Sequence, residues 1–192
     1  MLMNRGRGQL LVIDVQDRLA PHIAGGSEVV ANCCRLVAYA RRLGVPVTLT
    51  EHYPPGLGAT APAVLEAAGH PAASGASEVP PVLQKISFSC WRDDRIRDRI
   101  EDLRARRRDQ LVVAGMETHV CVGQTVLDLL GDSRHVFLVS DAVGSRSAAV
   151  RDAAIERLRG AGAHIVTQEM VAFEWLERGD HPAFKGLVKL IK

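Results

Sequence analysis

Three residues with acid–base or nucleophilic side chains, Asp14, Lys85 and Cys121, each come shortly after a short apolar run of the sequence. Such runs are typical of buried strands in a parallel sheet, and open α/β sheets bind ligands at the carboxyl ends of their strands. We therefore expect the three side chains to lie together. A thiol that attacks, a carboxylate that accepts its proton and an ammonium group that stabilises the thiolate form a nucleophilic catalyst.

Cys121 is the candidate nucleophile. An amphipathic segment, 122–130, begins directly after it and predicts a helix with Cys121 at the N-terminus. Unpaired N–H groups and the helix dipole favour a thiolate there, so we expect a lowered pKa. The alternative is a small buried residue that only packs. Cys90 is the rival nucleophile, but Asp93 and Asp94 indicate that the next helix starts after it.

Asp14 and Lys85 each have a structural alternative. Asp14 could be a turn or helix-cap residue, although Asp17 competes for that role. Lys85 could be a surface lysine, the most common kind. Its neighbours Leu83 and Phe88 are typical of a core and favour a buried lysine.

Apolar strands alternate with amphipathic helices along the chain. The predicted strands are 10–14, 46–50, 82–85, 111–114, 136–140 and 165–167, and the predicted helices are 27–43, 61–68, 94–107, 122–130, 147–160 and 182–191. This alternation predicts a three-layer α/β/α, Rossmann-like fold, with a mostly parallel six-stranded sheet and helices on both faces. We expect a single domain over 1–192, with 69–81 as a surface loop.

Composition is ordinary for a compact protein. The 192 residues are 47% hydrophobic and 24% charged, with a net charge of +2. The basic run 104–108 is typical of a solvated helix C-terminus, so we expect no nucleic-acid partner. No apolar run approaches the length of a membrane helix, the start is too polar for a signal peptide, and no Cys spacing suggests zinc. We expect a cytoplasmic protein with free thiols.

Six segments resemble the isochorismatase-like cysteine hydrolases. They are VIDVQ with Asp14, LQKISFSCW with Lys85, AGMETHVCV with Cys121, TEHYPPGLGAT at 50–60, SDAVGSRS at 140–147 and HPAFKGLVKLIK at 181–192. The last three look most like the isochorismatase-domain branch of bacteria and animals. The resemblance covers nearly the whole chain and implies a hydrolase with Asp14, Lys85 and Cys121 as its catalytic residues.

The resemblance also implies how the site works. Backbone N–H groups near Glu117 and Cys121 would hold the oxyanion, and the family's non-proline cis peptide would fall at Met116–Glu117. Because true isochorismatases lack the nucleophilic cysteine, Cys121 points to cleavage of a small amide-type C–N bond through a thioacyl-enzyme. We expect no cofactor and a homo-oligomer, a dimer or higher, with the apolar face of the tail 182–191 buried between chains.

We expect no metal. Nicotinamidases of a related family hold zinc with acidic and histidine ligands after the second strand. The corresponding region of this chain offers only Glu51 and His52, which are too few ligands for zinc. The sequence therefore disfavours nicotinamidase activity.

The expected pocket suits a small-molecule substrate with a partly apolar acyl group. Tyr53 and Leu57 belong to a loop predicted to lie over the site, although a Gly/Pro loop with no chemical role is the alternative. The expected lining is Tyr53, Leu57, Phe88, Trp91, Met116 and His119.

Two other functions stay open at this point. One is a catalytically silent protein of the same fold that binds a metabolite or a partner. The other is a thiol redox sensor that uses Cys121 or Cys90, which depends on whether the two cysteines lie close together.

Overall fold

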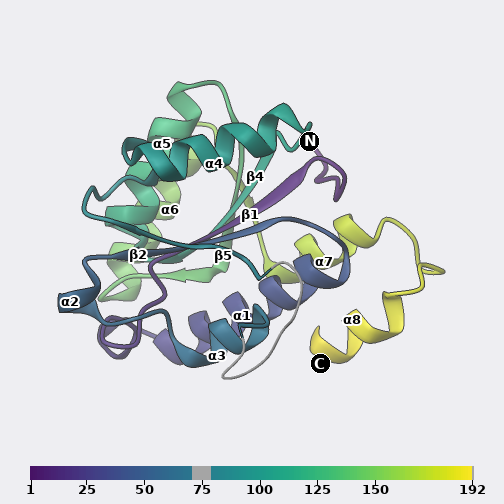
Figure 1. Ribbon diagram of the computed structural model, residues 1–192, viewed down its shortest axis with the longest axis horizontal. Helices are drawn as coiled ribbons and strands as arrows, with labels where there is room; N and C mark the ends of the chain where they lie inside the picture. The colour runs from purple at the N-terminus through teal and green to yellow at the C-terminus, as the bar shows by residue number, and fades with distance from the viewer. Residues whose placement is uncertain (71–78, 192) are drawn as a thin grey trace.

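The computed structural model describes residues 1–70 and 79–191, and its centre is a six-stranded parallel sheet (Figure 1). The strand order is β3-β2-β1-β4-β5-β6, and every neighbouring pair is parallel. The strands are β1 Gly8–Ile13, β2 Val47–His52, β3 Val82–Lys85, β4 Gln110–Met116, β5 His135–Gly144 and β6 His164–Val166. The predicted sheet is confirmed.

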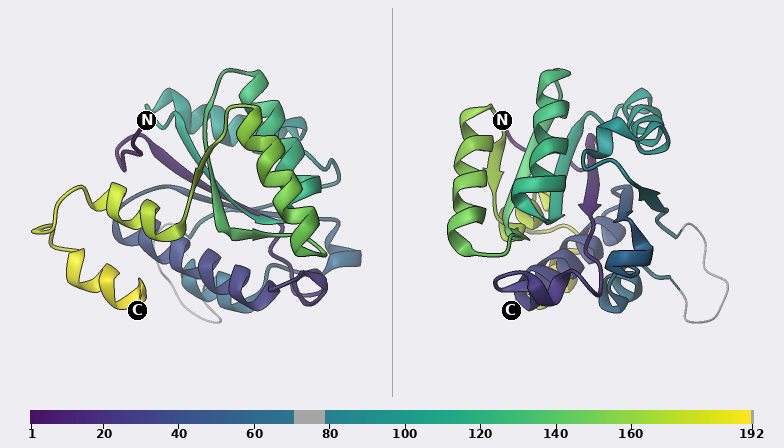
Figure 2. Two further views of the ribbon diagram at one scale, coloured as in Figure 1. Left: turned by 180° about the vertical axis from the view of Figure 1, so that it is seen from behind. Right: turned by 90° about the vertical axis from the view of Figure 1, so that its left-hand side faces the viewer.

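Helices connect the strands and cover both faces of the sheet, which gives three α/β/α layers (Figure 2). In the described part of the chain the α-helices are α1 Gly26–Arg42, α2 Pro54–Leu57, α3 Pro62–Ala67, α4 Asp94–Ala105, α5 Gly123–Gly131, α6 Ala148–Gly160, α7 Gln168–Leu176 and α8 Phe184–Ile191. Helices α1, α3, α7 and α8 pack on one face, and α4, α5 and α6 pack on the other.

The central strands feed two separate cores. Every residue of β1 and β4 is buried, as their continuous apolar sequence predicts. Because side chains alternate along a strand, Leu10 and Val12 enter the core under α1, whereas Leu11 and Ile13 enter the core under α4 and α5. Packed cores thus cover both faces of the sheet, and they fix the positions of residues at its carboxyl edge.

The sequence analysis missed some elements. Helix α7 was not predicted, although Thr167 caps it by accepting a hydrogen bond from the Met170 N–H. Strand β5 runs further than expected, to Gly144, after a register shift against β4. Residues 71–78 of the predicted surface loop lie outside the described residues.

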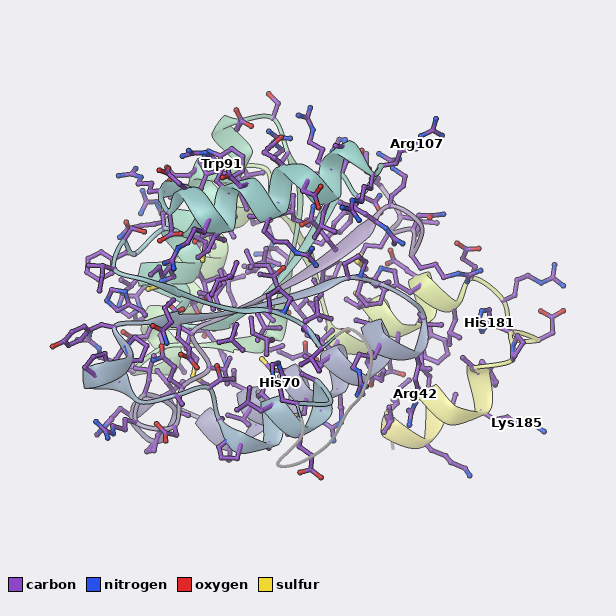
Figure 3. All side chains as sticks on the ribbon, in the orientation of Figure 1. Arg42, His70, Trp91, Arg107, His181 and Lys185 are labelled. Atoms are coloured by element: carbon purple, nitrogen blue, oxygen red, sulfur yellow. The ribbon has the colours of Figure 1, made fainter. Side chains whose placement is uncertain are left out.

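Helix α8 packs on its own chain. Leu187 is fully buried in the core that contains α1 and α7. Arg42 of α1 donates to the carbonyl oxygen of Gly186 at 3.2 Å, beside the labelled Lys185 (Figure 3). Much of the apolar face that we expected between chains is therefore covered within one chain, because α1 offers a matching apolar surface.

Within residues 1–70 and 79–191, no helix combines the length and the apolar character needed to cross a membrane.

Candidate active site

A buried ion pair joins the ends of β1 and β3. Asp14 directly follows β1, and Lys85 is the last residue of β3. Lys85 Nζ lies 2.6 Å from Asp14 Oδ2, and both side chains are 0% exposed. Removing two charges from water is costly and seldom gains stability, so a buried pair at the ligand-binding edge of the sheet indicates a chemical role.

Strand β2 lies between the two charged residues and fixes the carboxylate. Thr50 of β2 donates its hydroxyl to Asp14 Oδ1 at 2.7 Å, so both oxygens of the carboxylate are hydrogen-bonded. Asp14 itself has a φ of 53°, a left-handed conformation that non-glycine residues rarely adopt. Such strained positions cluster at functional sites. The sequence analysis missed Thr50, because only the register of β2 with β1 places it level with Ile13.

Cys121 lies in a π-helical turn at the third corner of the site. Strand β4 ends at Met116, the Met116–Glu117 peptide bond is cis, and the π-helix Thr118–Val122 then continues into α5. The helical segment begins at Thr118, so Cys121 lies in its first turn, two residues before the first residue of α5 and close to the predicted helix start. The cysteine is 6% exposed. Single π-turns at the start of helices often occur at functional sites.

The resting Cys121 is a thiol, contrary to our expectation of a lowered pKa. Burial raises its pKa, the charge of Asp14 raises it further, and the charge of Lys85 offsets these effects only in part. The dipole argument failed because it left out desolvation and the neighbouring anion. Burial by itself lowers the pKa of Lys85, but the charge of Asp14 and the two nearby thiols outweigh burial and raise it. The lysine is therefore an ammonium ion.

Cys90 lies just behind the ion pair. Its Sγ is 3.9 Å from the Thr50 hydroxyl, and its N–H donates to Thr125 Oγ1 at 2.9 Å. The Thr125 hydroxyl in turn donates to the carbonyl oxygen of Cys121 at 2.6 Å. Burial first, and the charge of Asp14 second, raise the pKa of Cys90 to about 12. This thiol is fully enclosed and neutral, which makes it a poorer nucleophile than one with a solvent-facing side.

Several predicted pocket residues lie at the carboxyl edge of the sheet near the ion pair, and we call this surface the mouth of the site. Tyr53 and Phe88 are about half exposed, at 51% and 50%. The Tyr53 N–H donates to the Lys85 carbonyl oxygen, so the loop with Leu57 starts directly beside the lysine. His119 is exposed, and its Nδ1 lies 3.0 Å from Ser145 Oγ.

The structure does not bring Met116 and Trp91 to this mouth. Met116 is fully buried in the core under α1, on the sheet face opposite the core that contains Cys121. Trp91 packs beside α4 and α5, and the Arg134 guanidinium lies 5.3 Å from its ring centroid (Figure 3). Both residues pack in the cores and support the fold. The sequence analysis placed them in the pocket because apolar character alone does not say which way a side chain points.

Glu117 is tied to the far side of the mouth by an ion pair. Its carboxylate accepts from Arg146 Nε at 3.0 Å, and its carbonyl oxygen accepts the N–H groups of Val120 and Val122. These bonds fix the backbone at Glu117. We expect the Glu117 N–H to point from this backbone toward the oxyanion of a bound substrate.

His52, the last residue of β2, is a site residue that the sequence analysis left out of the pocket. It is in register with Lys85, and its ring lies 5.2 Å from that of Phe88. Burial, followed by the charge of Lys85, lowers the pKa of His52, so the ring is neutral near pH 7. Among the described residues, no group of three or more His, Cys, Asp or Glu side chains is arranged to hold a metal ion.

Comparison with known proteins agrees with this fold. An isochorismatase domain model matches residues 9–170. The mouse isochorismatase domain-containing protein 2A is 34% identical over 184 residues, which cover 95% of this chain and 82% of the mouse protein. The MAR1 ribonuclease of Caenorhabditis elegans superposes with a TM-score of 0.88 at 34% identity, over 100% of this chain and 92% of the worm protein.

A more distant structure shares the fold. YcaC from Escherichia coli, described as an octameric hydrolase of unknown specificity, superposes with a TM-score of 0.86 at 22% identity. The match covers 100% of this chain and 89% of YcaC. The fold and site define a three-layer α/β protein with its polar centre at the carboxyl edge of a parallel sheet. This chain belongs to the isochorismatase family.

Proposed function

We propose that this chain is a cysteine hydrolase that cleaves small amide-type C–N bonds through a thioacyl-enzyme intermediate. The observation that carries the proposal is the enclosed set of carboxylate, ammonium and thiol formed by Asp14, Lys85 and Cys121. Membership of the isochorismatase family supports a hydrolase. The mouth with Tyr53 and Phe88 suits a small acyl group with an apolar side.

The charges of the set explain how a thiol with a raised pKa can react. In the resting state Asp14 is negative, Lys85 is positive and Cys121 is neutral. Transfer of the thiol proton to Asp14 gives a neutral acid, the same ammonium and a thiolate. The buried net charge stays at zero, so proton transfer avoids the desolvation penalty that blocks simple ionisation. Asp14 thus acts as a general base during attack.

The remaining steps follow from this proton transfer. The Cys121 sulfur attacks the carbonyl carbon, and the backbone N–H groups of Glu117 and Cys121 stabilise the oxyanion. As the C–N bond breaks, Asp14 returns its proton to the leaving amine. Water then attacks the thioester while Asp14 accepts a proton from it. The C–S bond breaks, the acid product leaves, and Asp14 passes its proton to the Cys121 sulfur, which restores the thiol and the carboxylate.

Two other functions compete with this proposal. The C. elegans neighbour is called a ribonuclease. However, the site of this chain offers the thiol only 6% exposure, which suits a small acyl group better than a phosphodiester chain. A redox sensor is the second competitor, since Cys90 and Cys121 both influence the pKa of Lys85. The raised pKa and low exposure of Cys121 favour hydrolysis, because sensor cysteines are exposed thiols with a lowered pKa.

The test is ammonia release from a panel of carboxamides, ureas and N-carbamoyl compounds. We expect at least one compound to be hydrolysed by the wild-type protein and by Cys34→Ala, which removes a partly exposed thiol remote from Asp14. Cys121→Ala should be inactive. Activity that survives Cys121→Ala, or cleavage of RNA oligonucleotides with no activity on the panel, would contradict the proposal.

We also propose that the protein is a homo-oligomer. Tyr53, Ile86 and Phe88 expose 51%, 72% and 50% of their surface around the mouth, more than a monomer usually leaves on neighbouring apolar side chains. The octameric E. coli hydrolase of the same fold supports an assembly of copies.

A further inference from the structure

A hollow lined by arginine residues lies at the edge of the sheet opposite the catalytic edge. Its volume is about 750 Å³, within the range of small-molecule sites. The lining comes from the end of α1, the segments that lead into β2 and β3, and α4 with the turn that follows it. The arginines are Arg41, Arg99, Arg106 and Arg108. The hollow lies at the amino ends of β2 and β3, whereas the catalytic candidates lie at the carboxyl edge of the sheet. The length of the six-residue strand β2, roughly 20 Å, therefore separates the hollow from the catalytic edge.

Three of these guanidinium groups have no carboxylate partner among the described residues. Arg106 pairs with Asp102 at 3.0 Å, but Arg41, Arg99 and Arg108 form no ion pair in 1–70 or 79–191. Three uncompensated cations around one hollow repel each other, and a bound anion would relieve that repulsion.

The hydrogen bonds of the arginines leave donors available. Arg108 donates to the carbonyl oxygens of Arg5, Gly8 and Gly44, the last two at 3.3 Å, and these contacts fix it without neutralising its charge. Arg41 donates one bond, to the Ala67 carbonyl oxygen at 3.1 Å. The Nε of Arg99 is enclosed and has no hydrogen-bond partner in the described part of the chain. A buried donor without an acceptor is uncommon in native proteins and calls for a partner such as an ordered water or an ion.

The other walls are apolar. Val45, Val47 and Leu103 line the hollow, and Pro46 and Pro81 contribute rings but no N–H groups. A ligand that fits both surfaces therefore combines an anionic group with an apolar or planar part. Guanidinium groups match phosphate oxygens through paired hydrogen bonds.

We propose that this arginine-lined hollow binds a phosphate-bearing small molecule, at a site separate from the catalytic edge. The proposal does not depend on the amidase function. A hollow of this size has room for one nucleotide-sized molecule, whereas a nucleic-acid chain would need a longer groove with several phosphate contacts. Arg107 directly precedes Arg108, and its exposed side chain points to solvent (Figure 3). It provides a matched control outside the hollow.

The test is calorimetric titration of the wild-type protein with pyrophosphate, with adenosine monophosphate and with a short single-stranded RNA, at 0.15 M salt. We expect saturable binding of at least one of the two small phosphates. Arg99→Gln and Arg41→Gln should each weaken binding about tenfold or more, the loss of one charge-assisted contact. Arg99→Lys should recover part of the affinity, and Arg107→Gln should bind like the wild type.

Three results would overturn the proposal. They are no saturable binding of either small phosphate up to 10 mM (about the weakest useful affinity), equal binding by Arg41→Gln and wild type, and binding of the RNA alone. Arg41 is exposed, so its variant keeps the test valid even if Arg99→Gln fails to fold. The unfolding temperature without ligand checks the fold of each variant.

Discussion

Asp14→Asn and Lys85→Met should change the reactivity of Cys121 in opposite directions, although both should abolish turnover. The charge of Asp14 raises the pKa of the thiol, and the charge of Lys85 lowers it. Removing the anion should therefore speed alkylation at pH 7–8, and removing the cation should slow it. Turnover should fall by at least about 100-fold in each variant, because each loses part of the general-base system. No thiol that merely packs in a core would show this pattern.

The magnitude follows from the enclosed geometry. Two unit charges about 4 Å apart interact by about 4 kcal/mol at an effective dielectric constant of about 20. One pKa unit corresponds to about 1.36 kcal/mol, so loss of the Asp14 charge could lower the thiol pKa by up to about 3 units. A third of that change already raises the thiolate fraction about tenfold. We therefore expect alkylation to be at least about tenfold faster in Asp14→Asn and about tenfold slower in Lys85→Met.

The assay is iodoacetamide labelling in a Cys34→Ala background, followed by mass spectrometry of the Cys121 peptide. With Asp14 and Lys85 intact, the rate should rise about tenfold per pH unit from pH 7 to pH 9 without a plateau, because the raised pKa keeps the residue protonated. Unfolding temperatures show whether each variant is folded, since breaking a buried ion pair costs about 3–5 kcal/mol. The reasoning is refuted if both variants change the rate in the same direction or if the rate levels off below pH 8.

Three further predictions concern the whole molecule. Burial raises the pKa values of all four cysteines, Cys33, Cys34, Cys90 and Cys121, so the unfolded chain loses these protons first. Stability should therefore fall as pH rises above about 8.5, by up to about 5 kcal/mol per pH unit for four thiols. Denaturant unfolding at pH 8, 9 and 10 measures the slope, which Cys33→Ala should reduce by about a quarter, and a flat profile would contradict the burial argument. The purified protein should carry no stoichiometric transition metal and chelators should leave its activity intact, whereas elemental analysis that finds one zinc per chain would restore the nicotinamidase reading. Light scattering at micromolar concentration should give a particle mass that is a multiple of the 20.8 kDa chain mass. If the exposed apolar side chains form the contact, Ile86→Asp should lower the particle mass toward that of one chain. A wild-type particle with the mass of a single chain would rule out the assembly.

The sequence predicted the sheet and the positions of the three catalytic candidates because both depend on local patterns. Apolar runs identify buried strands, and the polar residues that come shortly after each run mark the edge. The pattern did not predict the pKa of Cys121, which depends on an anion 107 residues earlier in the chain and on burial in the core with α4 and α5. It also did not assign faces, so Met116 was placed in the pocket although its side chain packs under α1.

Partners from neighbouring strands were likewise hidden. Thr50 and His52 become site residues only through the register of β2 with β1 and β3, and no motif in the sequence states that register. Helix α8 shows the same limit. Its strongly amphipathic sequence predicted an apolar face that needs a cover, but only the fold shows that α1 supplies the cover. Long-range packing, not local propensity, decided each of these outcomes.

The thioacyl-enzyme is the central claim, and it can be observed directly. A substrate found in the amide panel is mixed with the enzyme, the reaction is quenched in acid within milliseconds, and the peptides are analysed by mass spectrometry. The account predicts the mass of the acyl group on the Cys121 peptide, formed before or together with the first ammonia, and absent from Asp14→Asn. Ammonia release with no acyl group on Cys121 at any time, or an acyl group on Cys90 in its place, would contradict it.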